Sequence, residues 1–196
     1  MIEINNLIKK YGDRAVLDIE SLTIKKGEFV VLTGHNGSGK STLLKILAGT
    51  LKPTEGEFKA EGQLYYLPQQ SLPFNRSVRK NILCCLDGDT KSKKELCESI
   101  LEAFNLKHLE NKNAKTLSGG ECQRLALARV LCRKADIILL DEASSAADTQ
   151  SRRLINELIA EYHKKTCCTV IMTTHTGEMP DVKELRIINL CDGRIS

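Results

Sequence analysis

A glycine-rich run over positions 34–42 offers the clearest chemistry in the chain, and its letters are GHNGSGKST. Its first eight positions fit the pattern GxxxxGK[ST], in which glycines let backbone N–H groups turn inward around phosphate oxygens. Lys40 adds a full positive charge for the phosphates, and the hydroxyl of Ser41 suits Mg²⁺. The pattern predicts a phosphate-binding loop that consists of Gly34, His35, Asn36, Gly37, Ser38, Gly39, Lys40, Ser41 and Thr42.

The elements around this loop are the ones that such a loop needs. The continuous apolar run 29–32 before it predicts a strand buried on both faces. The run 41–48 after it predicts a helix that ends at Gly49, and the N-terminus of that helix adds partial positive charge. A random chain of this length would match the pattern in roughly one case in a hundred. Because strand, loop and helix occur in the required order, a chance match is the weaker interpretation.

Two carboxylates follow a second apolar run. Residues 137–140 read IILL and predict another buried strand, and Asp141 and Glu142 come directly after it. We expect this strand to lie beside the phosphate-loop strand in a parallel sheet, where ligands bind at the carboxyl ends of the strands. Asp141 would then hold Mg²⁺ through water, and Glu142 would act as a general base or orient the attacking water. The alternative is a strand that simply ends in a charged turn.

The run LSGGECQR at positions 117–124 is more selective. It resembles the signature motif of the ABC (ATP-binding cassette) family, and the resemblance covers essentially the whole chain. It implies that Ser118, Gly119, Gly120 and Glu121 act on an ATP molecule held by a second subunit. That arrangement is a head-to-tail dimer with two ATP molecules between phosphate loops and signatures. By itself, the run could also be only a helix cap and a turn.

Four further residues match positions at which this family has functional side chains. Tyr11 resembles the aromatic residue that stacks on adenine, and Gln69 resembles the glutamine that senses Mg²⁺ and the attacking water. Asp148 resembles the D-loop aspartate, and His175 resembles the switch histidine that holds the γ-phosphate and supports the catalytic glutamate. Taken alone, Tyr11 could be a packing residue of a turn, and His175 a structural histidine. Glu121 departs from the family, which most often has glutamine there, and brings a negative charge near a phosphate.

The remaining pattern predicts the elements that position these residues. Strand and helix signals alternate at both ends of the chain and flank a helical block, which favours an α/β fold. The resemblance implies a P-loop NTPase core with a mostly parallel sheet, an N-terminal antiparallel β lobe and an inserted helical subdomain. We expect one domain over residues 1–196, with the core at about 1–69 and 131–196 and the helical subdomain at about 70–130. Within the lobe, residues 53–62 are turn-rich and predict an edge hairpin.

Composition excludes several classes of protein. The 196 residues carry a formal net charge of +4, which is too small and too evenly spread for a nucleic-acid-binding surface. No apolar run is long enough to span a membrane and the N-terminus lacks a secretory signal, so we expect a cytoplasmic chain. The chain ends at Ser196, just past the last expected strand, so we expect no C-terminal regulatory domain. Most of the eight cysteines have apolar neighbours, which predicts buried free thiols, and the absence of CxxC spacing argues against a metal site.

The resemblance also implies a function for the whole chain. It would bind and hydrolyse ATP, with Mg²⁺ as the second cofactor, and it would act as a homodimer or paired cassette. ATP hydrolysis would power a membrane transporter, and import of a small solute is the favoured direction. Transmembrane permease subunits would hold it on the inner face of the cell membrane, and an importer would add a solute-binding protein. The permease would dock near Gln69, in a groove that includes Leu72, Phe74 and the helix expected at 77–86. The signature letters are loosely similar to those of small-anion systems such as tungstate uptake.

Two other functions remain open. A soluble ABC ATPase that acts on nucleic acid or a protein assembly would favour two linked cassettes, a coiled-coil insertion or a basic stripe. The sequence has none of these, so we expect no direct contact with nucleic acid. An inactive regulatory cassette would be expected to lack Glu142 or His175, and both are present.

Overall fold

The N-terminal strands form an antiparallel sheet of three strands. The computed structural model describes residues 1–145, 147–174 and 178–196. Its first sheet has the order β2 (Arg14–Ile24), β1 (Ile2–Tyr11) and β4 (Glu55–Ala60). This sheet confirms the predicted N-terminal antiparallel lobe.

The prediction of an edge hairpin at residues 53–62 is wrong. This segment supplies the single strand β4, which pairs with β1 in a register that sets Ile2 opposite Ala60. The chain then leaves for the second sheet, because β5 (Leu64–Leu67) pairs in parallel with β6 (Ile137–Asp141) and not with β4. Turn residues predicted the change of direction but could not indicate which strand the chain would pair with next.

The second sheet is mostly parallel, and it carries the ends of the strands on which the site is built. Its order is β5, β6, β7 (Thr169–Thr173), β3 (Phe29–Thr33), β8 (Leu185–Cys191) and β9 (Arg194–Ile195), of which only β9 is antiparallel to its neighbour. The prediction that β6 lies beside β3 is wrong, since β7 separates them. All five residues of β7 are buried, so this strand is shielded on both faces and paired on both edges.

Successive residues of the central strands point into two different cores. Val30 and Leu32 pack with α1 (Lys40–Leu47) and the apolar residues of the antiparallel sheet. Phe29 and Val31 face the other side and pack with α4 (Gly119–Leu131) and α5 (Thr149–Thr166). The period of two along each strand explains why continuous apolar runs are needed here, because both faces of the sheet are covered.

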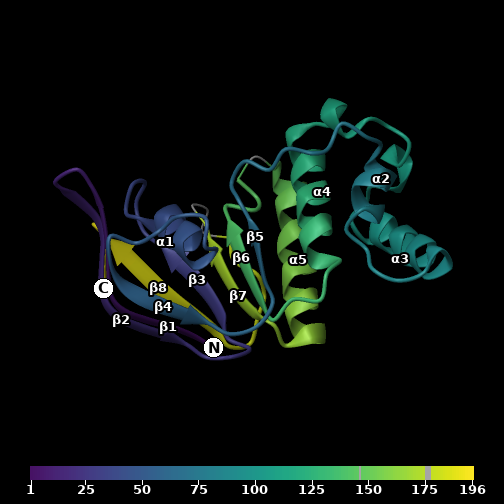
Figure 1. Ribbon diagram of the computed structural model, residues 1–196. Helices are drawn as coiled ribbons and strands as arrows, with labels where there is room; N and C mark the ends of the chain where they lie inside the picture. Colours follow the sequence, from purple (N-terminus) through teal and green to yellow (C-terminus); the bar gives the residue numbers. More distant parts are fainter. Residues whose placement is uncertain (146, 175–177) are drawn as a thin grey trace.

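A helical insertion connects β5 to β6. It contains α2 (Val78–Leu83), α3 (Thr90–Ala103), two short 3₁₀ turns (Lys107–Leu109 and Ala114–Thr116) and α4. In Figure 1, α4 and α5 lie side by side next to the second sheet, and α2 and α3 extend beyond them. Apolar residues of the insertion such as Ile82 and Leu101 belong to the same buried cluster as Val31 of the sheet.

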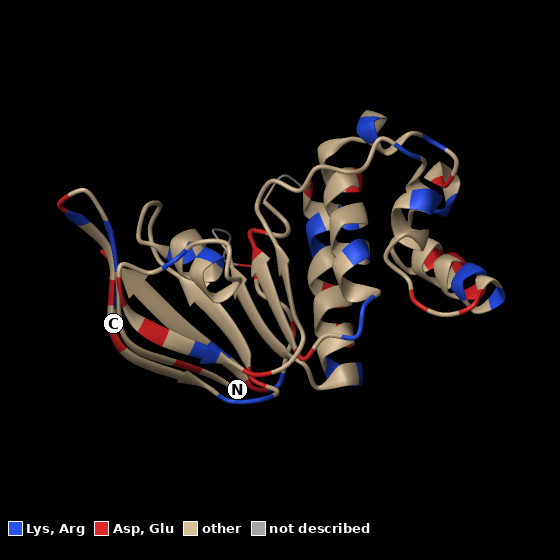
Figure 2. Cartoon of the chain, viewed as in Figure 1, with Lys and Arg blue, Asp and Glu red and all other residues tan. Residues whose placement is uncertain are grey.

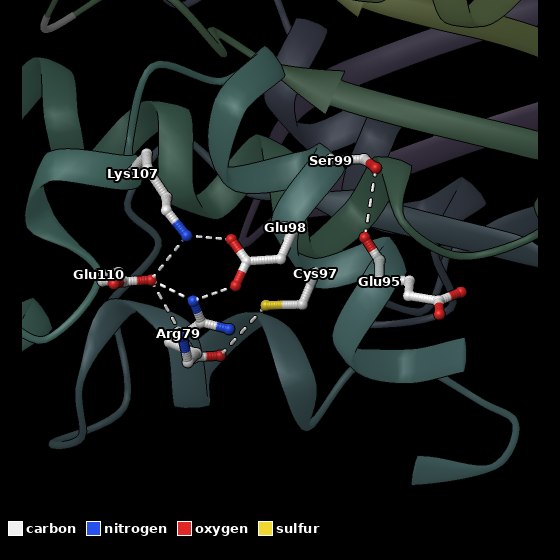
Figure 3. A network of polar contacts seen from close by, with 7 residues as sticks. All are labelled: Arg79, Glu95, Cys97, Glu98, Ser99, Lys107 and Glu110. Atoms are coloured by element: carbon white, nitrogen blue, oxygen red, sulfur yellow. Dashed lines mark hydrogen bonds and ion pairs between the residues drawn. The ribbon is translucent and has the colours of Figure 1, made fainter. Parts of the chain in front are cut away.

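A network of ion pairs joins the first helices of this insertion. The guanidinium of Arg79 on α2 contacts both Glu98 on α3 and Glu110, and Lys107 contacts the same two carboxylates (Figure 3). Figure 2 shows that α3 carries both basic and acidic residues, and along its sequence the lysines come first and the glutamates follow. No helix within the described residues is long and apolar enough to cross a membrane.

Candidate functional site

The phosphate loop joins the end of β3 to the start of α1. Lys40 Nζ donates to the carbonyl oxygens of Gly34 at 2.8 Å and His35 at 2.9 Å, so the ammonium group points into the loop. A Cβ on residue 34 would lie 2.1 Å from the carbonyl oxygen of Leu190, and Gly39, directly before α1, has a φ of 105°. Both positions therefore require glycine, which is the physical basis of the sequence pattern.

The electrostatics of the loop depend on Lys40. Burial lowers the pKa of its ammonium group, and the nearby carboxylates of Glu142 and Asp141 counteract part of this effect. Residues 34–39 form the loop, and residues 40–42 open α1. A glycine-rich turn, a cation and a helix N-terminus together suit the phosphate groups of a nucleotide, so the residues present fit ATP.

Asp141 accepts hydrogen bonds from hydroxyl groups on three other elements. Ser41 Oγ and Thr173 Oγ1 each donate to Asp141 Oδ1 at 2.9 Å. Tyr66 Oη donates to Asp141 Oδ2 at 3.3 Å, and the pKa of this phenol is raised by burial and by the adjacent carboxylate. The first turn of α1 thus brings Ser41 to Asp141, although β7 lies between β3, which leads into α1, and β6, which carries Asp141.

Glu142 is the next residue, and its backbone adopts an unusual conformation. Its φ is 53°, in the left-handed region that non-glycine residues seldom adopt and that costs on the order of 1–3 kcal/mol. Its N–H donates to Thr173 Oγ1 at 2.9 Å, which helps to hold this conformation. Gln69 Nε2 donates to Glu142 Oε2 at 2.7 Å. The structure therefore brings together Gln69 and Glu142, which the sequence placed at the ends of two different strands.

The donor set beside the loop fits Mg²⁺. Ser41 offers a hydroxyl oxygen, Asp141 a carboxylate and Gln69 an amide oxygen, and hard divalent cations prefer oxygen ligands of these kinds. Ser41 and Asp141 are already hydrogen-bonded to each other, and Gln69 donates to Glu142, the residue that follows Asp141.

The signature residues begin α4 with a capping box. Glu121 N–H donates to Ser118 Oγ at 3.4 Å, and Ser118 N–H donates to Glu121 Oε2 at 2.7 Å. The bond from the Ser118 amide lowers the pKa of Glu121, so its carboxylate is held in the charged form. The carboxylate of Glu121 thus has a local structural partner, and a glutamine amide could close the same box.

The signature run is linked through Ser151 to Asp148 of its own chain. Arg124 Nη1 donates to Ser151 Oγ at 2.6 Å, and Ser151 N–H donates to Asp148 Oδ1 at 2.8 Å. A Cβ on Gly120 would lie 3.2 Å from Ser151 Oγ. Ser118, Arg124, Asp148 and Ser151 are among the residues that line a cavity of about 710 Å³. In Figure 1, α4 lies on the far side of β6 and β7 from α1, so the signature does not close over the phosphate loop of the same chain.

One predicted site residue, Tyr11, makes none of the contacts described above, and another lies outside the described residues. The ring of Tyr11 stands at the end of β1, where the residue is 55% exposed and Lys9 Nζ lies 5.1 Å from the ring centroid. His175 lies outside the described residues, as does Ala146 of the predicted D-loop.

The apolar pair near Gln69 is on the surface. Leu72 is 86% exposed and Phe74 is 48% exposed. The guanidinium of Arg129 lies 4.2 Å from the ring centroid of Phe74, and its Nη1 donates to the carbonyl oxygen of Leu72. These contacts fix Leu72 and Phe74 against Arg129 of α4. Among the described residues, none covers the rest of their apolar surface, which stays exposed.

Sequence reasoning missed Tyr66 and Thr173, which complete the surroundings of Asp141. Thr173 is the last residue of β7 and pairs in register with Asp141. A polar residue directly after the apolar run 170–172 was the available signal for Thr173. Tyr66 had no such signal, because strand residues LYYL look like ordinary packing residues.

The loop, the carboxylates and the parallel sheet define a P-loop nucleoside triphosphatase with a helical insertion between two of its strands. The family model described as ABC transporter matches residues 17–145. The chain is 35% identical, over all of its length and 75% of the relative, to the aliphatic sulfonates import ATP-binding protein SsuB 1 of Streptomyces avermitilis. It is 34% identical, over 99% of its length and 96% of the relative, to the tungstate uptake system ATP-binding protein TupC of Peptoclostridium acidaminophilum.

A solved structure agrees with this assignment. The dimeric ATP-binding cassette MJ0796, in a post-hydrolysis state with ADP and Pi, is 29% identical with a TM-score of 0.87, and the match covers 100% of this chain and 97% of that one. The chain belongs to the ABC transporter family, as one of its ATP-binding and ATP-hydrolysing subunits.

Proposed function

We propose that this chain is the Mg²⁺-dependent ATPase subunit of a membrane importer for a small solute. The observation that carries the proposal is the meeting of Ser41 with Asp141 and of Gln69 with Glu142 beside the phosphate loop. The direction of transport rests on relatives that match over most of their length and whose names describe import and uptake systems.

Each residue of the site has a separate task in this proposal. Lys40 and the loop N–H groups hold the β- and γ-phosphates of ATP. Ser41, Gln69 and, through water, Asp141 hold Mg²⁺, which neutralises charge on the phosphates when bound. Glu142 orients the attacking water or accepts its proton, with Gln69 fixing one of its carboxylate oxygens.

The second half of each site comes from a partner subunit. Ser118, Gly119 and Gly120 lie at the N-terminus of α4, where the helix offers backbone donors and partial positive charge to the γ-phosphate of the partner's ATP. We propose a head-to-tail dimer on this basis, with Asp148 at the interface. His175 would contact the γ-phosphate and Tyr11 would stack on adenine.

The importer also needs membrane partners. We propose that permease subunits dock on Leu72, Phe74 and the adjoining α2, and that residues of about 70–130 form the subdomain that transmits movement to them. This contact would hold the chain at the cytoplasmic face of the membrane, with a solute-binding protein on the other side. An exposed apolar pair beside the glutamine that contacts Glu142 is a suitable link between docking and hydrolysis.

We further propose that the transported solute is a small oxyanion. This proposal follows the relatives whose names refer to sulfonates and tungstate, whereas others at 36% identity are named for zinc import. In reconstituted vesicles with the permease and binding protein, tungstate or a sulfonate should stimulate ATP turnover. Stimulation by cations or amino acids, and by neither anion, would exclude this solute class.

Affinity purification from native membranes tests the transport function. The unmodified chain should retain a membrane protein with several spans, and Phe74→Asp should lose it while keeping its basal ATP turnover. Ile195→Asp is a matched control, since it places the same charge on an exposed apolar residue of β9. Recovery of ribosomal or nucleic-acid partners and of no membrane protein would favour the soluble class of ABC ATPase instead.

A further inference from the structure

Three potential metal ligands gather on the outer side of the phosphate loop. His35 belongs to the loop, Cys191 is the last residue of β8, and Asp192 lies in the turn between β8 and β9. Cys191 is exposed, so the prediction of a buried thiol is wrong for this residue. One ligand atom from each, an imidazole nitrogen, the thiol sulfur and a carboxylate oxygen, lies within 4.8 Å of the other two. The mutual distance is close to what a single metal ion can bridge, and all three residues are exposed, so an ion has access from solvent.

The backbone holds the two segments together without a metal ion. Asp192 and Gly193 have φ values of 45° and 82°, which form a two-residue hairpin turn between β8 and β9. Gly193 N–H donates to the carbonyl oxygen of Ser38 at 3.1 Å, and Gly193 accepts from Asp18 N–H at 2.9 Å. The hairpin is therefore attached to the phosphate loop by main-chain bonds, and the ligands are positioned by rigid elements.

The orientation of the His35 ring is the one that metal-binding histidines adopt. Its Nδ1 lies 2.9 Å from the carbonyl oxygen of Asn36, and its Nε2 lies 3.2 Å from Asp192 Oδ1. A neutral imidazole has a single N–H, so if Nδ1 donates to the carbonyl, the lone pair of Nε2 faces the carboxylate. A histidine that donates one N–H to a backbone carbonyl and directs the other nitrogen toward anionic ligands is prepared to bind a cation.

We propose that His35 Nε2, Cys191 Sγ and the carboxylate of Asp192 form a Zn²⁺ site, and that Zn²⁺ bound there lowers the affinity of the phosphate loop for ATP. Nitrogen, thiolate and carboxylate ligands suit Zn²⁺, and three protein ligands leave the fourth tetrahedral position to water. The Mg²⁺ that accompanies the nucleotide prefers oxygen ligands throughout and does not compete for a thiolate. On binding, the thiol of Cys191 releases its proton to solvent as the sulfur–zinc bond forms.

The coupling to ATP follows from the two sides of His35. Its ring faces the metal ligands, and its carbonyl oxygen accepts from Lys40 Nζ at 2.9 Å. A metal ion that fixes the ring also fixes this carbonyl against the lysine, which must turn toward the phosphates when ATP binds. Linkage makes the effect reciprocal, so ATP lowers the affinity for Zn²⁺ by the same factor. This step rests on Lys40 binding phosphate, as the proposed function requires.

Metal binding is measured on the purified full-length chain in excess Mg²⁺ without nucleotide. The unmodified chain should bind one Zn²⁺ in competition with a chelating dye, and Co²⁺ in its place should show thiolate-to-metal charge-transfer absorption. Cys191→Ser should abolish that absorption and weaken Zn²⁺ binding at least about tenfold, and Asp192→Asn, which tolerates the positive φ, should weaken it similarly. Cys167→Ser, a change at another exposed cysteine, should have no effect. Equal Zn²⁺ binding in the Cys191→Ser variant, or none in the unmodified chain, would refute the site.

The coupling is measured with free Zn²⁺ buffered at a saturating level. The Kd for ATP of the unmodified chain should rise at least about fivefold, and that of Cys191→Ser should not change. Comparing the two chains removes the effect of Zn²⁺ chelation by ATP itself. Zn²⁺ binding with an unchanged Kd would refute the coupling. A chain that fails to bind ATP even without Zn²⁺ would contradict the proposed function instead, so the two failures are distinguishable.

Discussion

At the scale of single residues, Asp141 organises its surroundings through two oxygens. Oδ1 accepts from Ser41 and Thr173, and Oδ2 accepts from Tyr66. The residue is only 1% exposed, so its carboxylate depends on these donors for the hydrogen bonds that water would otherwise supply. The three hydroxyls fix the direction in which the carboxylate faces the start of α1.

Tyr66→Phe removes one of these donors and keeps the ring. We expect the ATP turnover rate to fall about ten- to a hundredfold, because a hydrogen bond to a charged group contributes roughly 1.5–3 kcal/mol. The Mg²⁺ concentration that gives half-maximal turnover should also rise. Titration of turnover with Mg²⁺ measures both quantities. Tyr65→Phe on the same strand is the control, and an equal loss in both variants would mean that Tyr66 does not act through Asp141.

Lys40→Ala tests the phosphate loop directly. Removing the buried ammonium group should weaken ATP binding and reduce turnover by at least about 100-fold, since an oriented charge at the transferred phosphate is lost. Equilibrium binding of a fluorescent ATP analogue and single-turnover assays separate the two effects. Unchanged turnover would contradict the assignment of the loop.

At the scale of elements, α4 joins packing and function. Its first turn is closed by the reciprocal bonds between Ser118 and Glu121. The rest of the helix packs against α5 and against the other helices of the insertion. Arg124, near the same end, reaches Ser151 on α5. The signature is therefore presented by a helix whose start is fixed locally and whose position is fixed by the neighbouring helix.

Glu121→Ala should lower the free energy of unfolding by about 0.5–2 kcal/mol, because it opens the capping box. Glu121→Gln should cost less, since the amide oxygen can still accept from the Ser118 N–H. Urea denaturation monitored by circular dichroism measures both values. If the two variants are destabilised equally, the charge of the carboxylate and not its hydrogen bond stabilises the helix start.

At the scale of the whole molecule, the two halves of the proposed site are on different parts of one chain. The phosphate loop lies beside the antiparallel sheet, and the signature lies beyond β6 and β7 on the helical side (Figure 1). A second copy in head-to-tail orientation would bring each signature to the other loop. A monomer should therefore bind ATP yet hydrolyse it slowly.

Glu142→Gln tests this arrangement. The variant should bind ATP, hydrolyse it at least about 100-fold more slowly, and elute as a dimer from a sizing column in the presence of ATP. The physical reason is that ATP bridges the two subunits until hydrolysis releases them. The unmodified chain with ADP should elute as a monomer. A variant that stays monomeric with ATP and keeps normal turnover would contradict both the role of Glu142 and the shared site.

The sequence by itself determined the parts of the site whose geometry is local. The loop at 34–42 needs glycines at fixed positions and a helix directly after it, and all of these lie within a few residues. The capping partners Ser118 and Glu121 are three residues apart. The α/β fold and the helical insertion were also predictable, because the periodicity of apolar residues changes where the elements change. The antiparallel lobe was implied only by the family resemblance.

Only the tertiary structure decided which distant residues meet. The place of β7 between β6 and β3, and the pairing of residues 53–62 as a single strand, depend on which strand edges are buried together. The contacts of Tyr66 with Asp141, and of His35 with Cys191 and Asp192, join segments far apart along the chain. No local pattern encodes such contacts, because they arise from the packing of whole strands and helices against one another.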